Sequence, residues 1–400
     1  MRTSSFALVL LAAVPAFAKD KDPGVLQLQV PHNNDRVEAL AVSPDGKLLA
    51  AVDEKHVRLF SLETGELMRS LSWSPSEQLE SVVFSKDGAT VFVGASDRKG
   101  TDDSGVHLRQ VEVKTGAVKA DLPAVPGQFA AKSLALSPDG KSLAMSNGFV
   151  CAAYDLGTGK VAWKQPEPQS GAVAYSPDGK NVVCGGGFKN ASRHFQVLDA
   201  TTGAVVKKVA IAGERVNSFS FSPDGKQLVI GANGVKQIEI FDTSTWAVSK
   251  TLDAGGDGKR AAFSPDGKMV VAPGKDGVLH FYDVAVGTKV ANSTNPSHFG
   301  AFTPSVFAVA WVGKLVLKAG WGGVDVLDAK GATRASLLSF ANKDGSDDWV
   351  AVTPAGTYAS SANAEKGWIG WWTKDGSLAD KKFWPKDKKK PDAVKAALKP

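Results

Sequence analysis

The sequence has little cysteine, methionine or tyrosine, and beyond its first residues it has no long apolar run. It contains two Cys, four Met and four Tyr among 400 residues. No stretch after residue 18 approaches the ~20 apolar residues that cross a bilayer, so we expect no membrane span in the mature chain. Cys151 and Cys184 permit a disulfide in an oxidising compartment without requiring one, and two buried thiols are the favoured interpretation.

Motifs that mark an active site are also missing. The chain has no Gly-x-Ser-x-Gly elbow, no His-Glu-x-x-His and no phosphate-binding glycine-rich loop. His56, His107 and His194 recur at equivalent places of separate repeats, too far apart to share one ion bound at ~2 Å. Three aspartates within residues 96–105 remain a separate calcium candidate. We therefore expect no catalytic residue, no cofactor and no bound metal.

The first eighteen residues resemble a secretory signal peptide. Arg2 supplies a positive start, residues 6–13 an apolar run, and Ala16-Phe17-Ala18 a small-x-small cleavage site. The run is too short to span ~30 Å of hydrocarbon, and no Cys follows it to carry a lipid anchor. We expect cleavage after Ala18 and a periplasmic or secreted protein.

The formal net charge of +6 is concentrated at the C-terminal end. The last twenty residues hold eight Lys and two Asp, so the remainder of the chain is balanced. No aromatic spacing suited to base stacking accompanies these lysines, and we expect no nucleic acid partner. A solvated Lys-rich tail at 385–400 is the favoured interpretation, and contact of this tail with an anionic cell envelope is the alternative.

One tetrapeptide recurs along the whole chain. Ser-Pro-Asp-Gly stands at 43–46, 137–140, 176–179, 222–225 and 264–267, with variants at 85–88, 311–314 and 353–356. Pro presets φ, Asp bonds to its own backbone and Gly tolerates φ > 0, so each copy predicts a tight turn. Apolar residues alternate with small ones before each copy, which predicts a strand with one face in a core.

Each repeat carries four strand signals. A short apolar strand follows the tetrapeptide, and a third strand ends in an aromatic or aliphatic residue that is usually followed by Asp. Tyr154-Asp155 and Phe241-Asp242 show this ending, and a Thr-Gly turn such as Thr158-Gly159 then leads to a fourth strand. Division of residues 24–384 into eight units gives about 45 residues for each.

This repeat resembles that of the WD-repeat β-propellers. Aromatic-Asp pairs stand where the family has Trp-Asp, the Gly-His dipeptide is absent, and the resemblance covers nearly all of the mature chain. Residues 349–358, 367–371 and 390–394 are similar to the closing segment of bacterial WD-repeat proteins that often carry a caspase-like peptidase domain. That domain has no room here, so the resemblance implies the repeat scaffold only.

We therefore predict an all-β fold, with a signal peptide at 1–18 and one propeller domain of four-stranded blades at 19–384. Eight blades are favoured. The early strand at 24–30 would complete the last blade, whose own strands come from 349–372, and so clasp the ring shut. Seven blades plus an appended hairpin are the alternative.

Partner binding is expected on one face of this ring. The stereotyped turns fall on one face and the variable connections on the other, where specific recognition can sit. Polar residues mark the mouth of the axis on that variable face; they are Glu38, Glu80, Lys132, Asn217, Lys259 and Asp348, with Arg36, Arg215 and Trp321 nearby. We predict that this rim contacts a protein partner, although any strand that enters solvent becomes polar.

The function predicted from the sequence is a non-catalytic, monomeric, exported scaffold for protein interactions. One alternative is a propeller enzyme, either a lactonase-like hydrolase or a quinone-dependent dehydrogenase. The other is a binder of an anionic envelope polymer that uses the Lys-rich tail.

Overall fold

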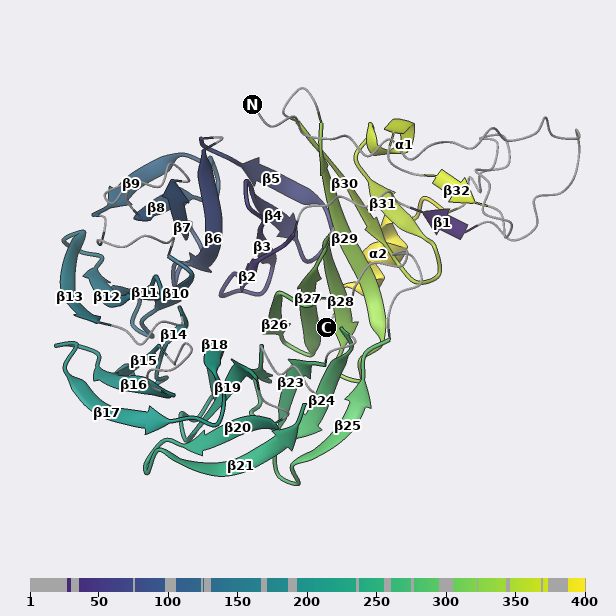
Figure 1. Ribbon diagram of the computed structural model, residues 1–400. Helices are drawn as coiled ribbons and strands as arrows, with labels where there is room; N and C mark the ends of the chain where they lie inside the picture. Colours follow the sequence, from purple (N-terminus) through teal and green to yellow (C-terminus); the bar gives the residue numbers. More distant parts are fainter. Residues whose placement is uncertain are drawn as a thin grey trace, which may run out of the picture.

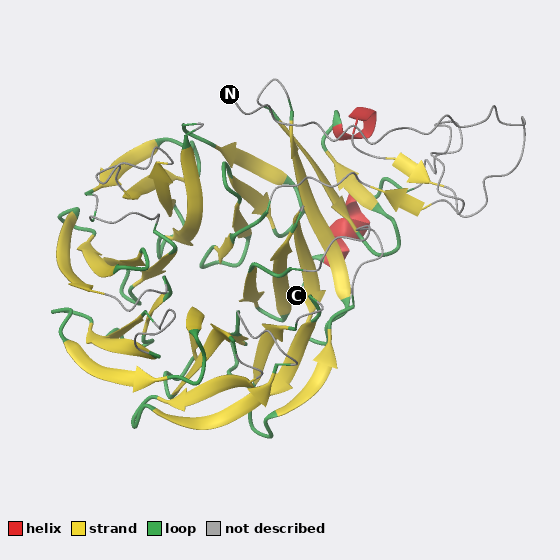
Figure 2. Cartoon of the chain, in the orientation of Figure 1, coloured by secondary structure: helices red, strands yellow, loops and turns green. Residues whose placement is uncertain are grey.

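The structure is a computed structural model that describes residues 27–29, 36–74, 76–97, 106–123, 125, 131–166, 171–185, 193–234, 237–254, 260–274, 277–294, 305–321, 323–342, 346–367, 370–372 and 388–399. Within these residues the chain is almost entirely strand and turn (Figure 2). No helix among them is long and apolar enough to cross a bilayer.

Seven sheets surround one central axis (Figure 1). Blade 1 is β2 (Ala39–Val42), β3 (Leu48–Val52), β4 (Val57–Ser61) and β5 (Leu67–Leu71); blade 2 is β6 (Glu77–Phe84), β7 (Thr90–Asp97), β8 (Val106–Glu112) and β9 (Val118–Leu122); blade 3 is β10 (Ser133–Leu136), β11 (Ser142–Ser146), β12 (Val150–Asp155) and β13 (Lys160–Pro166); blade 4 is β14 (Val173–Tyr175), β15 (Asn181–Cys184), β16 (His194–Asp199) and β17 (Val205–Ala210).

The remaining blades follow the same order. Blade 5 is β18 (Arg215–Phe221), β19 (Gln227–Asn233), β20 (Gln237–Asp242) and β21 (Ala247–Asp253); blade 6 is β22 (Ala262–Phe263), β23 (Met269–Pro273), β24 (Leu279–Asp283) and β25 (Thr288–Asn292); blade 7 is β26 (Ala308–Val312), β27 (Leu315–Gly320), β28 (Gly323–Asp328) and β29 (Thr333–Ala341). Neighbouring strands are antiparallel, and the first strand of each blade lies nearest the axis.

The tetrapeptides form the turns between first and second strands, as their chemistry predicts. In blade 5 the Ser222 hydroxyl donates to Asp224 at 2.6 Å and accepts the Gln227 N–H at 2.9 Å. Gly225 completes this turn with φ +71°. The Ser222 hydroxyl holds the pKa of Asp224 below its usual range, so this carboxylate stays ionised and caps the turn.

The turns between third and fourth strands pack on the preceding blade. A Cβ on Gly203 of blade 4 would lie 2.5 Å from the ring of Trp163 on β13, and one on Gly116 of blade 2 would lie 2.7 Å from Leu71 on β5. The Trp163 indole also donates to the Ala200 carbonyl at 2.9 Å. These glycines are therefore needed for close approach between blades as well as for their positive φ.

The prediction of eight blades is wrong, because the eighth repeat does not form a blade. Its tetrapeptide turn joins β30 (Asp347–Val352) to β31 (Tyr358–Ser360), and β30 pairs with the outer edge of β29. Blade 7 thereby becomes a sheet of six strands. Val37 of blade 1 donates to the Gly320 carbonyl of blade 7 at 3.2 Å, so the ring closes at seven.

The early strand does not clasp the ring either. β1 (Gln27–Gln29) pairs with β32 (Gly370–Trp372), so the expected pairing with the C-terminal segment is present. This two-stranded sheet lies outside the ring, near α1 (Ala364–Gly367), while blade 7 takes all its strands from later in the chain (Figure 1).

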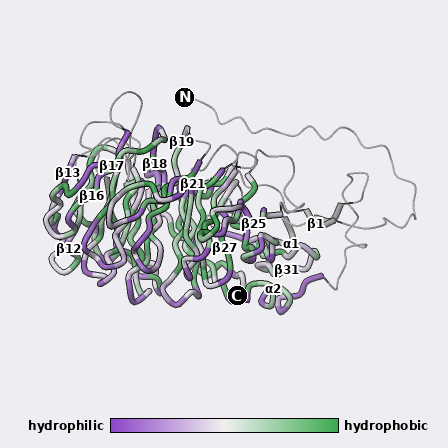
Figure 3. The backbone as a smooth tube through the Cα atoms, turned by 90° about the horizontal axis from the view of Figure 1, so that it is seen from below, coloured by the Kyte–Doolittle hydropathy of each residue, from purple (hydrophilic) through white to green (hydrophobic). Residues whose placement is uncertain are grey.

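The C-terminal segment closes the seam between blades 7 and 1. Val394 of helix α2 (Pro391–Ala397) and the following Leu398 are fully buried in a core shared with both blades. A Cβ on Gly65 of blade 1 would lie 2.7 Å from Ala351 of β30 and 3.3 Å from Leu398. Viewed from the edge of the ring, α2 and β31 lie together at one side (Figure 3). The described part of the expected tail, 388–399, is therefore docked on the fold.

A buried ion pair also crosses this seam. Arg58 of β4 is 3% exposed and pairs with Asp53 of its own blade. Its Nε lies 3.3 Å from Asp347 of β30. Because a buried charge without a partner is costly, loss of either carboxylate would destabilise the contact between blade 1 and the C-terminal hairpin.

The two cysteines are bonded, which corrects the favoured interpretation of two thiols. Cys151 of β12 and Cys184 of β15 form a disulfide with their Cα atoms 6.5 Å apart. Both side chains are fully buried. The bond joins blade 3 to blade 4 across a loop of 33 residues, which by the chain-entropy relation stabilises the fold by about 3–4 kcal/mol.

The close approach between blades can be tested by paired glycine substitutions. Gly203 and Gly148 both have positive φ, but a Cβ on Gly148 meets nothing within 4 Å. Gly148→Ala should cost only the backbone strain, about 1 kcal/mol, whereas Gly203→Ala should cost about 1–3 kcal/mol more because Trp163 must move. Denaturant unfolding measures both, and equal losses would show that the Trp163 contact does not constrain this turn.

Candidate functional site

A cavity of about 600 Å³ opens on the axis of the ring. It is lined by residues just before the innermost strands and by loops such as Pro273-Gly274, so it lies on the face opposite the tetrapeptide turns. Charged and amide side chains dominate the lining; they are Arg36, Glu38, Gln78, Glu80, Lys132, Arg215, Asn217, Asn233 and Arg260. We call this space the axial cavity.

The structure brings six of the nine predicted rim residues to the axial cavity. These are Arg36, Glu38, Glu80, Lys132, Arg215 and Asn217. Trp321 lies beside them, in a β-bridge with Arg36 and 38% exposed. Lys259 falls outside the described residues. Their role in binding a partner stays a prediction.

Asp348 does not belong to this group. It lies on β30, outside the four strands of blade 7, and it is 5% exposed. Its carboxylate accepts hydrogen bonds from Asn342 at 3.0 Å and Ser361 at 2.8 Å. The position was assigned on the assumption that residues 349–372 form a blade, and that blade does not exist.

Sequence reasoning missed Arg260 and Phe307, which both line the axial cavity. The prediction of the rim depends on one fixed spacing, because it takes the polar residue that lies five positions before each tetrapeptide. Arg260 is one residue out of that spacing, ahead of the two-residue strand β22. Phe307 precedes the degenerate seventh repeat, whose tetrapeptide is too altered for the same spacing to be counted from it. The neighbouring Lys259 was the only signal for Arg260.

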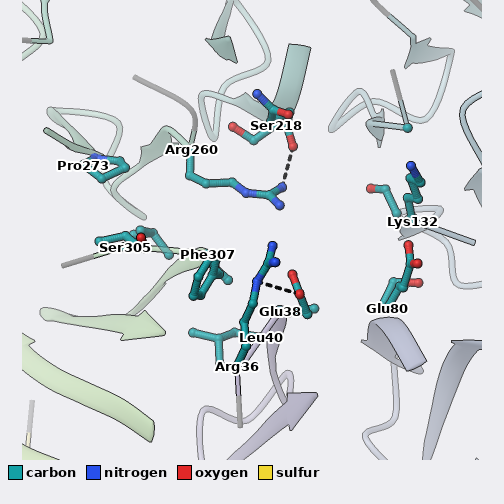
Figure 4. Close-up of a pocket in the computed structure, with 18 of the residues that line it drawn as sticks. Arg36, Glu38, Leu40, Glu80, Lys132, Ser218, Arg260, Pro273, Ser305 and Phe307 are labelled. Carbon is teal, nitrogen blue, oxygen red and sulfur yellow. Dashed lines mark hydrogen bonds and ion pairs between the residues drawn. The ribbon is translucent and has the colours of Figure 1, made fainter. Parts of the chain in front are cut away.

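The wall formed by blades 7 and 1 combines charge with aromatic surface. The Arg36 Nε lies 2.7 Å from a Glu38 oxygen, and its guanidinium carbon lies 4.1 Å from the centre of the Phe307 ring (Figure 4). Phe307 in turn meets Trp321 edge to face, with ring centres 5.6 Å apart. Such stacking and pairing hold the Arg36 guanidinium in place at the cavity mouth.

The wall formed by blades 5 and 6 is held by an amide network. Arg260 donates to the Asn217 carbonyl at 2.6 Å. The Asn217 side-chain amide donates to Asn233 at 2.8 Å and to the Arg215 carbonyl at 3.3 Å. These bonds fix the Arg260 guanidinium where it points into the axial cavity (Figure 4).

Burial and like charges shape the electrostatics of the axial cavity. Its described lining contains four cationic residues and two carboxylates, and the charge of Glu54 raises the pKa of both carboxylates. Burial raises the pKa of Glu38 more than Arg36 lowers it, and burial raises the pKa of Glu80 more than Lys132 lowers it. The site therefore holds an excess of positive charge in a partly dehydrated space.

The guanidinium, ammonium and amide groups of the axial cavity can donate hydrogen bonds that bind and orient a ligand. Among the residues that the structure describes, no group of three or more His, Cys, Asp or Glu is placed to hold a metal ion. The Nδ1 of His56, one of the three recurring histidines, lies 3.3 Å from Asp53, which also pairs with the buried Arg58. No nucleophile paired with a base is found among the described lining residues.

Comparison with known proteins agrees with this architecture. A sequence profile described as "WD domain, G-beta repeat" matches residues 25–61, which include the first three strands of blade 1. A chain of the "Crystal Structure of Mitotic Checkpoint Complex" superposes with a TM-score of 0.61 at 18% identity, covering 80% of this chain and 96% of that one. The fold is a seven-bladed β-propeller, and its first repeat is similar to the WD repeat.

The matching curated proteins align with only a short part of this chain. "Target of rapamycin complex subunit LST8" of Mus musculus is 29% identical over 75 residues, 18% of this chain, and the Rattus norvegicus protein of the same name matches equally. The match spans 23% of the length of those relatives. The matched segment is longer than one repeat, and the match does not identify a binding partner of this chain.

The aromatic-Asp pairs of this propeller stabilise the turns and blade contacts next to them. Asp155 accepts the Thr158 N–H at 2.7 Å and its hydroxyl at 3.1 Å, so it caps the turn that follows. The Tyr154 hydroxyl donates to the Pro123 carbonyl at 2.8 Å, and burial raises the Tyr154 pKa. These bonds join third strands to turns and neighbouring blades without the Gly-His dipeptide.

Proposed function

We propose that this WD-repeat propeller is a non-catalytic scaffold that binds a protein partner over its axial cavity. WD-repeat propellers commonly bind proteins, and the cavity is where side chains from several blades converge. The observation that carries the proposal is the combination of Arg36, Phe307 and Trp321 at the cavity mouth. Arginine and tryptophan in partly dehydrated, packed positions are the residues that dominate protein interfaces.

Charges of both signs in the axial cavity support recognition of a specific partner. Lys132 of blade 3 lies near Glu80 of blade 2, and Arg36 pairs with Glu38 on blade 1. Complementary charges raise association rates and reject partners of the wrong pattern. The tetrapeptide face, by contrast, repeats one capped turn from blade to blade, so it carries less information for recognition.

Charge reversal at Lys132 tests this proposal. Lys132→Glu should weaken capture of the partner from the cell's own extract by about tenfold, which corresponds to ~1.4 kcal/mol, because a cation at the cavity becomes an anion. Lys226→Glu reverses an exposed lysine on the tetrapeptide face and is the matched control. Quantitative mass spectrometry of the captured proteins gives the comparison, with thermal unfolding of each variant as a check on folding.

The proposal fails if the folded Lys132→Glu protein captures the same proteins, in the same amounts, as the wild type. It also fails if Lys226→Glu weakens capture equally, since the partner would then not distinguish the two faces.

We also propose that the protein is exported and acts in the periplasm or outside the cell. The signal-like pattern of residues 1–18 supports this, and so does the Cys151–Cys184 disulfide, because structural disulfides persist in oxidising compartments. Mass spectrometry of the protein from its own cells should find Lys19 as the first residue. A cytosolic chain that retains residues 2–18 would refute export.

A further inference from the structure

The geometry points to one chemical class of partner segment. We propose that the axial cavity binds an acidic peptide segment and holds one of its carboxylates between the guanidinium groups of Arg36 and Arg260. This inference rests on the proposed function, since it names what part of the protein partner enters the cavity.

The two arginines come from opposite sides of the seventh blade. Arg36 precedes β2 of blade 1 and Arg260 precedes β22 of blade 6, while Phe307 belongs to blade 7, which stands between those two blades in the ring. Figure 4 shows their guanidinium groups pointing toward one another inside the axial cavity. Two planar donor forks that face a common space can hold one carboxylate from both sides.

Within the described lining, two carboxylates face four cationic residues, so these arginines are only partly neutralised there. Glu38 acts electrostatically on both, and it forms its ion pair with Arg36. Burial lowers the pKa of Arg260, Glu38 opposes this effect, and Arg215 and Arg36 add to it. Like charges gathered in a partly dehydrated space repel, and an incoming carboxylate relieves this repulsion.

The size of the axial cavity favours a short segment. At about 600 Å³ it falls within the ~300–1,000 Å³ range of small-ligand sites, so it admits a few residues of a loop or terminus and excludes a folded domain. Phe307 and the half-exposed Trp321 form an apolar wall beside Arg36. The methylene groups of a Glu side chain can pack on this wall while its carboxylate reaches the arginines.

A singly charged carboxylate fits this site better than a phosphate. Glu38 and Glu80 offset half of the positive charge of the four described cationic lining residues, which limits the attraction for an anion. The cost of dehydrating an entering anion grows with the square of its charge, whereas its attraction to the cavity grows only in proportion to that charge. A phosphoryl group carries nearly two negative charges at neutral pH, whereas a Glu or Asp side chain carries one. Tight phosphate sites concentrate cations without such carboxylates.

Three labelled peptides test the proposal. The probe is a fluorescein-labelled peptide with three glutamates between serines, and its companions carry glutamine or phosphoserine at the same three places. Fluorescence anisotropy with the mature, folded chain should show binding of the glutamate peptide, with at least tenfold weaker binding of the glutamine peptide. The phosphoserine peptide should bind no more tightly than the glutamate peptide.

Variants then assign the binding to the two arginines. Arg36→Gln and Arg260→Gln should each weaken binding of the glutamate peptide about tenfold, and Arg260→Lys should recover little of the loss because it lacks the planar fork. Arg193→Gln removes an exposed arginine on the same face that does not line the axial cavity, and it should change binding less than twofold. Arg36 is partly exposed, so its variant keeps the test valid if Arg260→Gln does not fold.

The inference is overturned if the glutamine peptide binds as well, if the phosphoserine peptide binds more tightly, or if Arg193→Gln has the same effect as Arg260→Gln. Partner capture separates this failure from failure of the proposed function. If Lys132→Glu abolishes capture while the glutamate peptide neither binds nor competes, only the acidic segment is refuted. If neither Lys132→Glu nor Arg36→Gln alters capture, the cavity is not the binding site at all.

Discussion

The ring depends on one repeated contact, in which the turn between the third and fourth strands of each blade lies against the outermost strand of the blade before it. Gly116 meets Leu71 in this way, Gly203 meets Trp163, and in blade 5 the Thr245 carbonyl accepts a bond from Lys207. Blade 1 takes this contact from blade 7, because a Cβ on Gly65 would lie 3.3 Å from Leu337 of β29. Ala351 and Leu398 of the C-terminal segment add to it at the same glycine, so the circle closes without an exchange of strands between its ends.

Closure of the ring also positions the axial cavity. Arg36, Phe307 and Arg260 belong to blades 1, 7 and 6, and the seam between blades 7 and 1 passes among them. The Arg36–Phe307 contact and the Arg36–Trp321 bridge both cross that seam. The C-terminal hairpin and α2 do not line the cavity, yet they hold together the two blades that carry Arg36 and Phe307.

The turns, the inner strands and much of the axial cavity could be predicted from the sequence, because they depend on neighbouring residues. The number of blades and the contacts between distant segments could not, because they depend on long-range strand pairing. The Ser-Pro-Asp-Gly turns and the strands before them follow from neighbouring residues, and so does the placement of Glu38, Glu80 and Lys132 at the axis. Whether a repeat becomes a blade depends on which edge its hairpin meets, and the turn at 353–356 forms equally well in a hairpin added to β29. The same limit explains the misplaced Asp348, the missed Phe307, and the disulfide between cysteines of adjacent blades.

Hydrogen exchange of a single full-length variant tests the role of the C-terminal segment most directly. Leu398→Ala removes a buried side chain at the seam, with a cost of about 2–5 kcal/mol, and Lys395→Ala removes an exposed one from the same helix as its control. Our account predicts that in Leu398→Ala the amides of β2–β5 and β26–β29 exchange at least ~10-fold faster, while those of β14–β17 across the ring are unchanged. Unchanged exchange at the seam, or equal acceleration in every blade, would contradict it.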